Sequence, residues 1–353
     1  MRLGIVGTDL APLDQKFGAL EKLCFGWACK LNQMGYEVHM FSIPFPTGID
    51  VNRVNLHTFS DQEELDHKLG KASLDAVVIN NRPTWHGAGI RARLNIFHNY
   101  PDAWMSAKSD DLGQHLADAR NLAVSAALAN EINTLFPNAK ASVLYPFIDQ
   151  QILEAGQNWP HEPIHSPAAP IRALFPNRTL EKKGLRWLIA TIDQHLLGMV
   201  ALTVIRNISP WTHETDEHRA LLDLAHSRNY VTVTDKVLEA HELIRLYRNH
   251  DVVITPSTRE EGLGLIPLEA QAVGTPVIAS SLGGLKESVF KPNQTVAVGS
   301  KAELAKAILA AIDIAAPVRA AIAQRVAKTF SPEASAISLA RELDNLFDGN
   351  RFG

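Results

Sequence analysis

Cysteine is almost absent from this chain of 353 residues, which contains only Cys24 and Cys29. Two thiols cannot form the disulfide scaffold of a chain this long, and they cannot supply a closed zinc site by themselves. Both lie in a stretch with a helical pattern, at a spacing that does not share one helical face. We therefore expect two reduced core thiols, as is typical of cytoplasmic proteins.

The chain also lacks an excess of positive charge and any long apolar run. Its net charge is −4, so it has no overall positive field to attract nucleic acid, and no nucleic-acid partner is expected. The N-terminal segment MRLGIVG is too short for a signal peptide, and no apolar run reaches the roughly 20 residues of a membrane helix. These features predict a cytoplasmic protein and leave open a weak peripheral contact with the inner face of the membrane.

What the chain does contain is an alternation of short apolar segments with helical patterns. The segments are apolar throughout, as is typical of strands covered on both faces of a parallel sheet. Between the first two segments, Trp27 and Leu31 recur at helical spacing and Gly35 stands where a helix would end. The predicted strands are residues 2–7, 37–42, 75–79, 94–97, 122–125, 142–145, 171–176, 199–205, 230–234, 251–255, 276–280 and 295–298.

This alternation predicts an α/β protein with two Rossmann-like domains, each with a doubly wound parallel sheet, facing a central cleft. Residues 154–170 contain four prolines and little periodicity, which indicates a linker. The first domain then covers 1–153 and the second covers 171–330. Residues 331–353 begin with Ser-Pro and read as an amphipathic helix, which we expect to pack back on the first domain. Ligands are expected at the carboxyl ends of the strands.

The most informative stretch is PSTREEGLGLIPLEAQAVGTPVIAS, residues 256–280. It follows an apolar strand and places a glycine-rich loop before a helix that has Pro267 near its first turn. Glycines let a ligand approach the backbone closely, and the N–H groups and dipole of a helix N-terminus attract anions. The loop residues expected to contact the ligand are Gly262, Leu263, Gly264 and Leu265.

Two glutamates, Glu261 and Glu269, lie on this loop and in the helix that follows it. Carboxylates would repel a phosphate that they touched, so they fit better as acceptors for sugar hydroxyls beside it. Taken singly, Glu261 fits a solvated loop charge, and Glu269 fits a complement to the helix dipole. The whole arrangement of strand, glycine loop and helix favours a binding site over these plainer roles.

A second candidate is the basic loop in FPNRTLEKKGL, residues 175–185, where Arg178 and Lys183 follow the first strand of the second domain. An arginine fork and a lysine point charge suit a diphosphate, although a basic loop alone is as often solvated surface. In the first domain, Gly18 and Ala19 stand at the start of the first helix without the G-x-G-x-x-G pattern of nicotinamide-binding proteins, and this helix start is a weaker candidate for binding a sugar or phosphate. His98 ends a predicted strand, and no histidine spacing indicates a metal site.

Together these motifs resemble those of the retaining glycosyltransferases with the GT-B fold that carry an E-x7-E motif, the group 1 or family 4-like enzymes. The resemblance covers nearly the whole chain and is most specific over residues 256–289 and 178–185. The residues that match the family's glutamates, its phosphate-loop cations and its strand-end histidine are Glu261, Glu269, Arg178, Lys183 and His98.

The resemblance implies transfer of a sugar from a nucleoside-diphosphate sugar, UDP- or GDP-linked, to a hydroxyl of a glycan, a lipid-linked or a small acceptor. It implies retention at the anomeric carbon without a metal or other cofactor. Glu269 would bind ribose hydroxyls, Glu261 would orient the donor sugar, and His98 would contact that sugar. Arg178 and Lys183 would neutralise the departing diphosphate.

The chain departs from the family pattern at two positions. Gly18-Ala19 replaces a Gly-Gly pair, and Asn177-Arg178 replaces Gly-Arg. The methyl group of Ala19 would narrow the choice of acceptor or reduce turnover. Two alternatives stay open, a nucleotide-sugar epimerase or hydrolase on the same fold and a sugar-nucleotide-binding protein without catalysis. The presence of both glutamates and both cations argues against the second.

Overall fold

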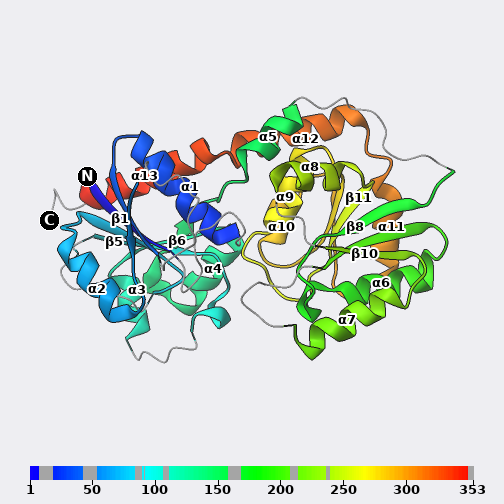
Figure 1. Cartoon of the computed structure of the whole chain (residues 1–353), viewed down its shortest axis with the longest axis horizontal. Helices are drawn as coiled ribbons and strands as arrows, with labels where there is room; N and C mark the ends of the chain where they lie inside the picture. Colours follow the sequence, from blue (N-terminus) through cyan, green and yellow to red (C-terminus); the bar gives the residue numbers. More distant parts are fainter. Residues whose placement is uncertain are drawn as a thin grey trace. The chain divides into compact units, whose positions relative to one another are not determined.

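The computed structural model describes residues 1–7, 19–42, 54–83, 90, 92–105, 111–157, 168–206, 214–235 and 239–348. The chain divides into two compact units, which we call unit 1 (Met1–Phe147 with Pro332–Gly353) and unit 2 (Ile148–Ser331). Each unit contains one parallel sheet with helices packed on it (Figure 1). This confirms the predicted fold class of two parallel α/β domains. Most of the predicted linker, 154–170, lies outside the described residues.

Unit 1 contains a seven-stranded sheet in the order β3-β2-β1-β4-β5-β6-β7. All of its strand pairs are parallel. Its strands are β1 (Arg2–Val6), β2 (Glu37–Ser42), β3 (Asn55–Thr58), β4 (Ala76–Asn80), β5 (Ala92–Phe97), β6 (Arg120–Ala123) and β7 (Ser142–Val143). The sequence pattern predicted all of these strands except β3, a polar edge strand in which no residue is fully buried.

The helices of unit 1 come from both ends of the chain. They are α1 (Ala19–Gln33), α2 (Gln62–Lys71), α3 (Leu112–Ala117), α4 (Ala126–Leu135) and α13 (Pro332–Asp348). Trp27 of α1 is fully buried, and its indole Nε1 donates to Ser335 Oγ of α13 at 2.9 Å. The Ser335 hydroxyl in turn donates to the carbonyl oxygen of Tyr145 at 2.7 Å. The last helix thus supplies a hydrogen-bond partner inside the core of unit 1.

Unit 2 contains a six-stranded parallel sheet in the order β10-β9-β8-β11-β12-β13. Its strands are β8 (Ile171–Phe175), β9 (Val200–Arg206), β10 (Val231–Asp235), β11 (Val252–Thr255), β12 (Val277–Ser280) and β13 (Gln294–Val296). Its helices are α5 (Gln150–Gln157), α6 (Leu185–His195), α7 (Asp216–His226), α8 (Ala240–Arg248), α9 (Leu265–Ala272), α10 (Leu285–Ser288), α11 (Lys301–Ala311) and α12 (Ala316–Thr329).

The main apolar core of unit 2 lies where α6, α7 and α11 cover one face of the sheet, while α8, α9 and α10 lie on the other (Figure 1). Strand β8 has β9 on one side and β11 on the other, so the order of the strands reverses direction between β8 and β11. In sheets of this kind ligands bind at that switch, beyond the carboxyl ends of the strands. The loops that follow β8 and β11 are the two that the sequence singled out.

Within the described part of the chain, no single helix combines the length and the apolar composition of a bilayer span. The segments Lys301–Ala311 and Ala316–Phe347 pass that test only jointly, as a pair bent by 105°.

A glycine in α5 gives a test of the packing in unit 2. A Cβ added to Gly156 would lie 1.8 Å from the carbonyl oxygen of Ala272 in α9. This clash is with backbone, so it can be relieved only by moving one helix away from the other. We expect Gly156→Ala to lower the free energy of unfolding of unit 2 by about 1–3 kcal/mol in guanidinium titrations.

The control is Gly70→Ala in α2 of unit 1, where the added Cβ would meet nothing within 4 Å, and its effect is measured on the unfolding of unit 1. That variant should gain up to about 1 kcal/mol from the higher helix propensity of alanine. Equal stabilities for the two variants would contradict the close contact between α5 and α9.

Candidate functional site

The loop after β8 and the loop after β11 are tied together at their backbones. Thr258 donates to the carbonyl oxygen of Lys182 through its backbone N at 2.8 Å and through its hydroxyl at 3.3 Å. Asn177 is buried, and its Nδ2 donates to the carbonyl oxygen of Ile254 in β11 at 3.2 Å. The asparagine that replaces the family's glycine therefore anchors the cationic loop to the neighbouring strand.

Gly184 allows these two loops to approach closely. It adopts a φ of +81° between the short 3-10 helix Glu181–Lys183 and α6. A Cβ at this position would lie 1.8 Å from the carbonyl oxygen of Pro256. Only glycine fits both the backbone conformation and the space.

This contact brings Lys183 to Glu261. The Lys183 Nζ lies 2.5 Å from Glu261 Oε1, and the two side chains are 15% and 20% exposed. The Ser257 hydroxyl donates to the same carboxylate oxygen. Arg178 is exposed on the same loop as Lys183. Unit 2 thus brings Lys183 and Glu261, which the sequence had placed in two separate motifs, into one ion pair.

The electrostatics of this cluster keep Glu261 ionised. Burial is the largest single influence and raises the pKa of the Glu261 carboxyl, while the charge and hydrogen bond of Lys183 lower it. The Ser257 hydrogen bond and the charge of Arg178 lower this pKa further, so the net pKa of Glu261 lies below its ordinary value. A lowered carboxyl pKa stabilises the fold above the pKa of the unfolded state, and that contribution is lost as the pH falls through the folded-state pKa.

The glycine loop leads directly into α9. Gly264 caps this helix with a φ of +89°, and Leu263 is buried beneath the loop. The backbone N of Gly284 donates to the carbonyl oxygen of Glu261 at 2.9 Å. A Cβ on Gly284 would lie 2.0 Å from the carbonyl oxygen of Gly262. Glycine at position 284 therefore allows its backbone to pack directly against the loop. Helix α9 begins at Leu265, directly after this loop, and the N–H groups and dipole of a helix N-terminus attract anions.

Glu269 lies on α9 and is held by a tyrosine that sequence reasoning missed. The Tyr247 hydroxyl donates to Glu269 Oε2 at 2.7 Å. Burial first, and then the charge of Glu269, raise the pKa of Tyr247 well above its ordinary value, so the phenol stays a neutral donor. No local motif indicates this contact, because Tyr247 lies in α8, 22 residues earlier in the chain.

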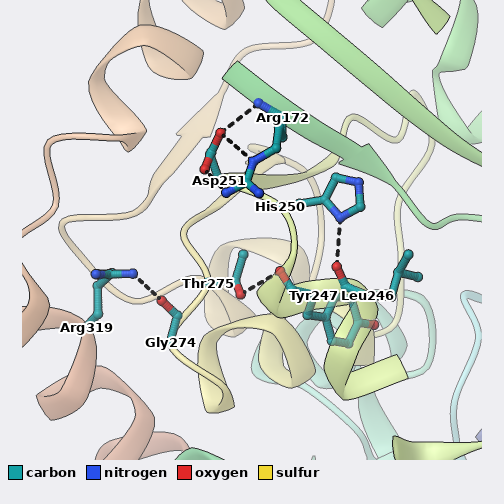
Figure 2. A network of polar contacts seen from close by, with 8 residues as sticks. All are labelled: Arg172, Leu246, Tyr247, His250, Asp251, Gly274, Thr275 and Arg319. Atoms are coloured by element: carbon teal, nitrogen blue, oxygen red, sulfur yellow. Dashed lines mark hydrogen bonds and ion pairs between the residues drawn. The ribbon is translucent and has the colours of Figure 1, made fainter. Parts of the chain in front are cut away.

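Figure 2 shows how the end of α8 that carries Tyr247 is fixed. The Thr275 hydroxyl donates to the Tyr247 carbonyl oxygen at 3.0 Å, and His250 Nδ1 contacts the Leu246 carbonyl oxygen at 2.7 Å. Above them in the view, the buried Asp251 accepts from the backbone N of Arg172 at 2.7 Å and from its Nη2 at 2.9 Å. These contacts fix the last turn of α8 and tie the segment between α8 and β11 to β8, and Tyr247 reaches Glu269 from that last turn.

The other face of α9 is fixed by a buried glutamine. Gln271 Nε2 donates to the carbonyl oxygens of Pro267 at 2.7 Å and Ser288 at 2.6 Å. Its Oε1 accepts from the backbone N of Phe290 at 2.8 Å and from Asn293 Nδ2 at 3.1 Å. The helix that carries Glu269 is therefore restrained on two sides by buried polar side chains, which favours a preorganised site.

His98 belongs to unit 1, directly after β5. Its Nε2 lies 3.0 Å from Oδ1 of Asn80, a fully buried residue at the end of β4. Asn80 Nδ2 donates to the carbonyl oxygen of Val6 at 2.8 Å, so the Asn80 oxygen must face the imidazole. The proton of the neutral ring then lies on Nε2. The backbone N of His98 also donates to Asn81 Oδ1 at 2.8 Å.

These contacts present His98 as a neutral acceptor. Burial lowers its pKa to about 3, so the imidazole is uncharged at neutral pH. With the proton on Nε2, the Nδ1 lone pair is left to accept a hydrogen bond from a hydroxyl.

The predicted residues of the first βα loop do not belong to the contacts described above. Gly18 falls outside the described residues, and Ala19 is the first residue of α1. Among the described residues, no group of three or more histidines, cysteines and acidic residues could hold a metal ion. A cavity of about 480 Å³ lies at the ends of β9 and β10, lined by Arg206, Arg219 and Asp235 among others, and contains none of the predicted site residues.

Comparison with known proteins agrees with this geometry. Residues 171–313 match the family model of the glycosyl transferases group 1. An uncharacterized glycosyltransferase of Methanocaldococcus jannaschii is 24% identical over 330 residues, which cover 82% of this chain and 83% of that protein. The family match includes both loops at the switch of the unit 2 sheet.

Solved structures show the same fold. The sucrose-phosphate synthase of Thermosynechococcus elongatus has a TM-score of 0.75 at 18% identity, covering 99% of this chain and all of that one. The Anabaena protein HepE in complex with UDP-glucose has a TM-score of 0.71 at 18% identity, covering 98% of this chain and all of that one. The predicted GT-B-like architecture is thus confirmed at the level of the fold.

The contact between Asn80 and His98 predicts the charge state of the histidine. In Asn80→Asp a carboxylate beside Nε2 favours the imidazolium, so the pKa of His98 should rise from about 3 toward the ordinary value of about 6.5. Two-dimensional ¹H–¹⁵N NMR of the imidazole nitrogens measures both the pKa and the tautomer.

The control is Asn99→Asp, which adds the same charge at the exposed residue next to His98 in sequence. It should leave the His98 titration nearly unchanged. A wild-type histidine protonated on Nδ1 instead of Nε2 would contradict the assignment.

Proposed function

We propose that the chain is a retaining glycosyltransferase of the group 1 family with a nucleotide-sugar donor, because residues 171–313 match the model of that family and its two predicted loops lie within the match. On this premise we propose how its residues divide the work. We propose a UDP- or GDP-linked sugar as donor. The UDP-linked form comes first, because the structurally similar HepE holds UDP-glucose. The acceptor is a hydroxyl of a glycan, a lipid-linked or a small molecule.

The observation that carries the proposal is the meeting of the cationic loop and the glycine loop in unit 2. Lys183 and Arg178 offer positive charge beside the N-terminus of α9, and this combination suits a diphosphate. The carboxylates of Glu261 and Glu269 suit hydroxyls, which donate hydrogen bonds, and not phosphates. We therefore assign the diphosphate to Arg178, Lys183 and the loop of Gly262 to Leu265, the donor sugar to Glu261 and the ribose to Glu269.

The proposed chemistry is stabilisation of a leaving group. Breaking the anomeric C–O bond leaves negative charge on the diphosphate and positive charge on the sugar. A preorganised donor aimed at such developing charge is typically worth about 3–4 kcal/mol. A leaving phosphate oxygen takes the proton of the acceptor hydroxyl, so the reaction needs no separate general base. Arg178 and Lys183 would perform the neutralisation in this scheme.

His98 would serve the donor sugar from unit 1. An uncharged ring with Nε2 held by Asn80 has Nδ1 available to accept from a sugar hydroxyl. We also place the protein in the cytoplasm, because within the described residues neither Cys24 nor Cys29 forms a disulfide, as is typical of a reducing compartment.

Removing either cation tests the diphosphate assignment. Lys183→Ala or Arg178→Ala should lower kcat/KM by about 10²–10³-fold while the protein stays folded, because one charge stabiliser is lost. The neighbouring Lys182→Ala removes an exposed lysine and retains the backbone carbonyl that Thr258 contacts, so it should have near wild-type kinetics. Wild-type kinetics in Lys183→Ala and Arg178→Ala would remove the assignment.

The ribose assignment is tested by nucleotide binding. Glu269→Ala should weaken binding of the nucleoside diphosphate, and Tyr247→Phe should weaken it less, because the phenol only positions the carboxylate. A thermal-shift panel of UDP, GDP and ADP measures this, since a bound ligand raises apparent stability. Unchanged shifts in Glu269→Ala would exclude the ribose role.

Dependence on an acceptor separates transfer from the alternatives. Release of diphosphate from the donor should require an added acceptor source, such as cell extract, and should be slow without it. Release that is independent of acceptor would indicate the epimerase or hydrolase, and binding without release would indicate a protein that has lost catalysis.

A further inference from the structure

We propose that Glu261 is a specificity-determining residue that selects the intact nucleotide sugar over the free nucleoside diphosphate, by competing with phosphate for Lys183. This inference rests on the proposed function, because it assumes that the loops of unit 2 bind a sugar diphosphate. It goes further by giving Glu261 an effect on the phosphate end of the ligand as well as on the sugar.

The starting observation is that Lys183 already has a counter-ion. Its Nζ lies 2.5 Å from Glu261 Oε1, at charge-assisted hydrogen-bond distance, and both side chains are largely buried. The Ser257 hydroxyl donates to the same oxygen, which fixes the carboxylate on the side of the lysine. Any diphosphate that takes Lys183 must therefore compete with a carboxylate held in place by the protein.

Separating Lys183 from Glu261 costs more free energy here than it would at an exposed surface, because both side chains are largely shielded from water. If phosphate draws Lys183 away, the partners that Glu261 retains among the described residues are the Ser257 hydroxyl and the more distant charge of Arg178. A carboxylate with reduced pairing in a largely buried position is unfavourable, and it also repels the incoming phosphate. A free nucleoside diphosphate that binds Lys183 has no group to replace the lysine at Glu261, so the free-energy cost of the poorly paired carboxylate remains.

An intact nucleotide sugar carries hydroxyl groups that can replace Lys183 as hydrogen-bond donors to Glu261, and the free diphosphate has no sugar to do so. Its sugar hydroxyls donate to Glu261 and replace the hydrogen bond from Lys183, while the lysine moves to the diphosphate. Both members of the ion pair then have a partner. Glu261 therefore disfavours the diphosphate product more than the donor, which also promotes product release after transfer.

Glu261→Gln tests this effect because the amide keeps the shape of the side chain and removes its charge. Isothermal titration of the variant with UDP and with UDP-glucose, and with the GDP pair if wild type prefers guanine, gives the selectivity as a ratio of Kd values. UDP should bind about tenfold more tightly than to wild type, which corresponds to about 1.4 kcal/mol. UDP-glucose should bind no more tightly than to wild type, so the ratio should shift about tenfold toward the free diphosphate.

The matched control is Glu260→Gln, which removes the same charge from the exposed residue immediately before Glu261. It should leave the ratio unchanged. Inorganic pyrophosphate serves as a probe that lacks sugar and base, and it should follow UDP in Glu261→Gln. If that variant is poorly folded, Glu261→Asp keeps the charge and shortens the side chain, and it should shift the ratio in the same direction by a smaller factor.

The outcomes separate this inference from the proposed function. Unchanged or weaker UDP binding in folded Glu261→Gln, or equal tightening of both ligands, would overturn the role of Glu261 while leaving the glycosyltransferase intact. Wild-type protein that binds neither nucleotide nor nucleotide sugar would instead overturn the proposed function.

Discussion

The ion pair between Lys183 and Glu261 is the interaction on which the rest of the candidate site depends. It forms because two loops follow neighbouring strands at the switch of the unit 2 sheet, and because glycine at 184 lets their backbones touch. Ser257 fixes the Glu261 carboxylate within its own loop, and Asn177 ties the other loop to Ile254 of β11. Opposite charges are thus gathered at the loop before α9, where we propose that the diphosphate and the sugar of the donor bind.

Much of the fold could be predicted from the sequence, because strands buried on both faces are apolar throughout. Segments such as Ala76–Asn80 and Val252–Thr255 have no exposed residue, so apolar runs identify them. The strand Asn55–Thr58 was missed for the converse reason. It lies at the edge of its sheet, pairs only with β2, and consists of polar or half-buried residues that read as a loop.

The site could be predicted where one short stretch carries the chemistry, and not where distant elements meet. Glu261 and Gly264 lie in one such stretch, and their local structure follows the pattern of strand, loop and helix. The partners of these residues lie elsewhere. Tyr247 reaches Glu269 from another helix, and Asn80 reaches His98 from a neighbouring strand. Such contacts depend on the order of strands in the sheet, which a single sequence does not reveal.

The position of Ser335 in the core of unit 1 has a consequence for how the chain is made. The indole of Trp27 is synthesised more than 300 residues before its partner. A chain emerging from the ribosome therefore completes all of unit 2 before unit 1 can close its core. Until α13 arrives, the apolar surface of α1 is exposed in the nascent chain and is open to chaperones. Premature termination near residue 330 would leave a finished unit 2 attached to an unfinished unit 1.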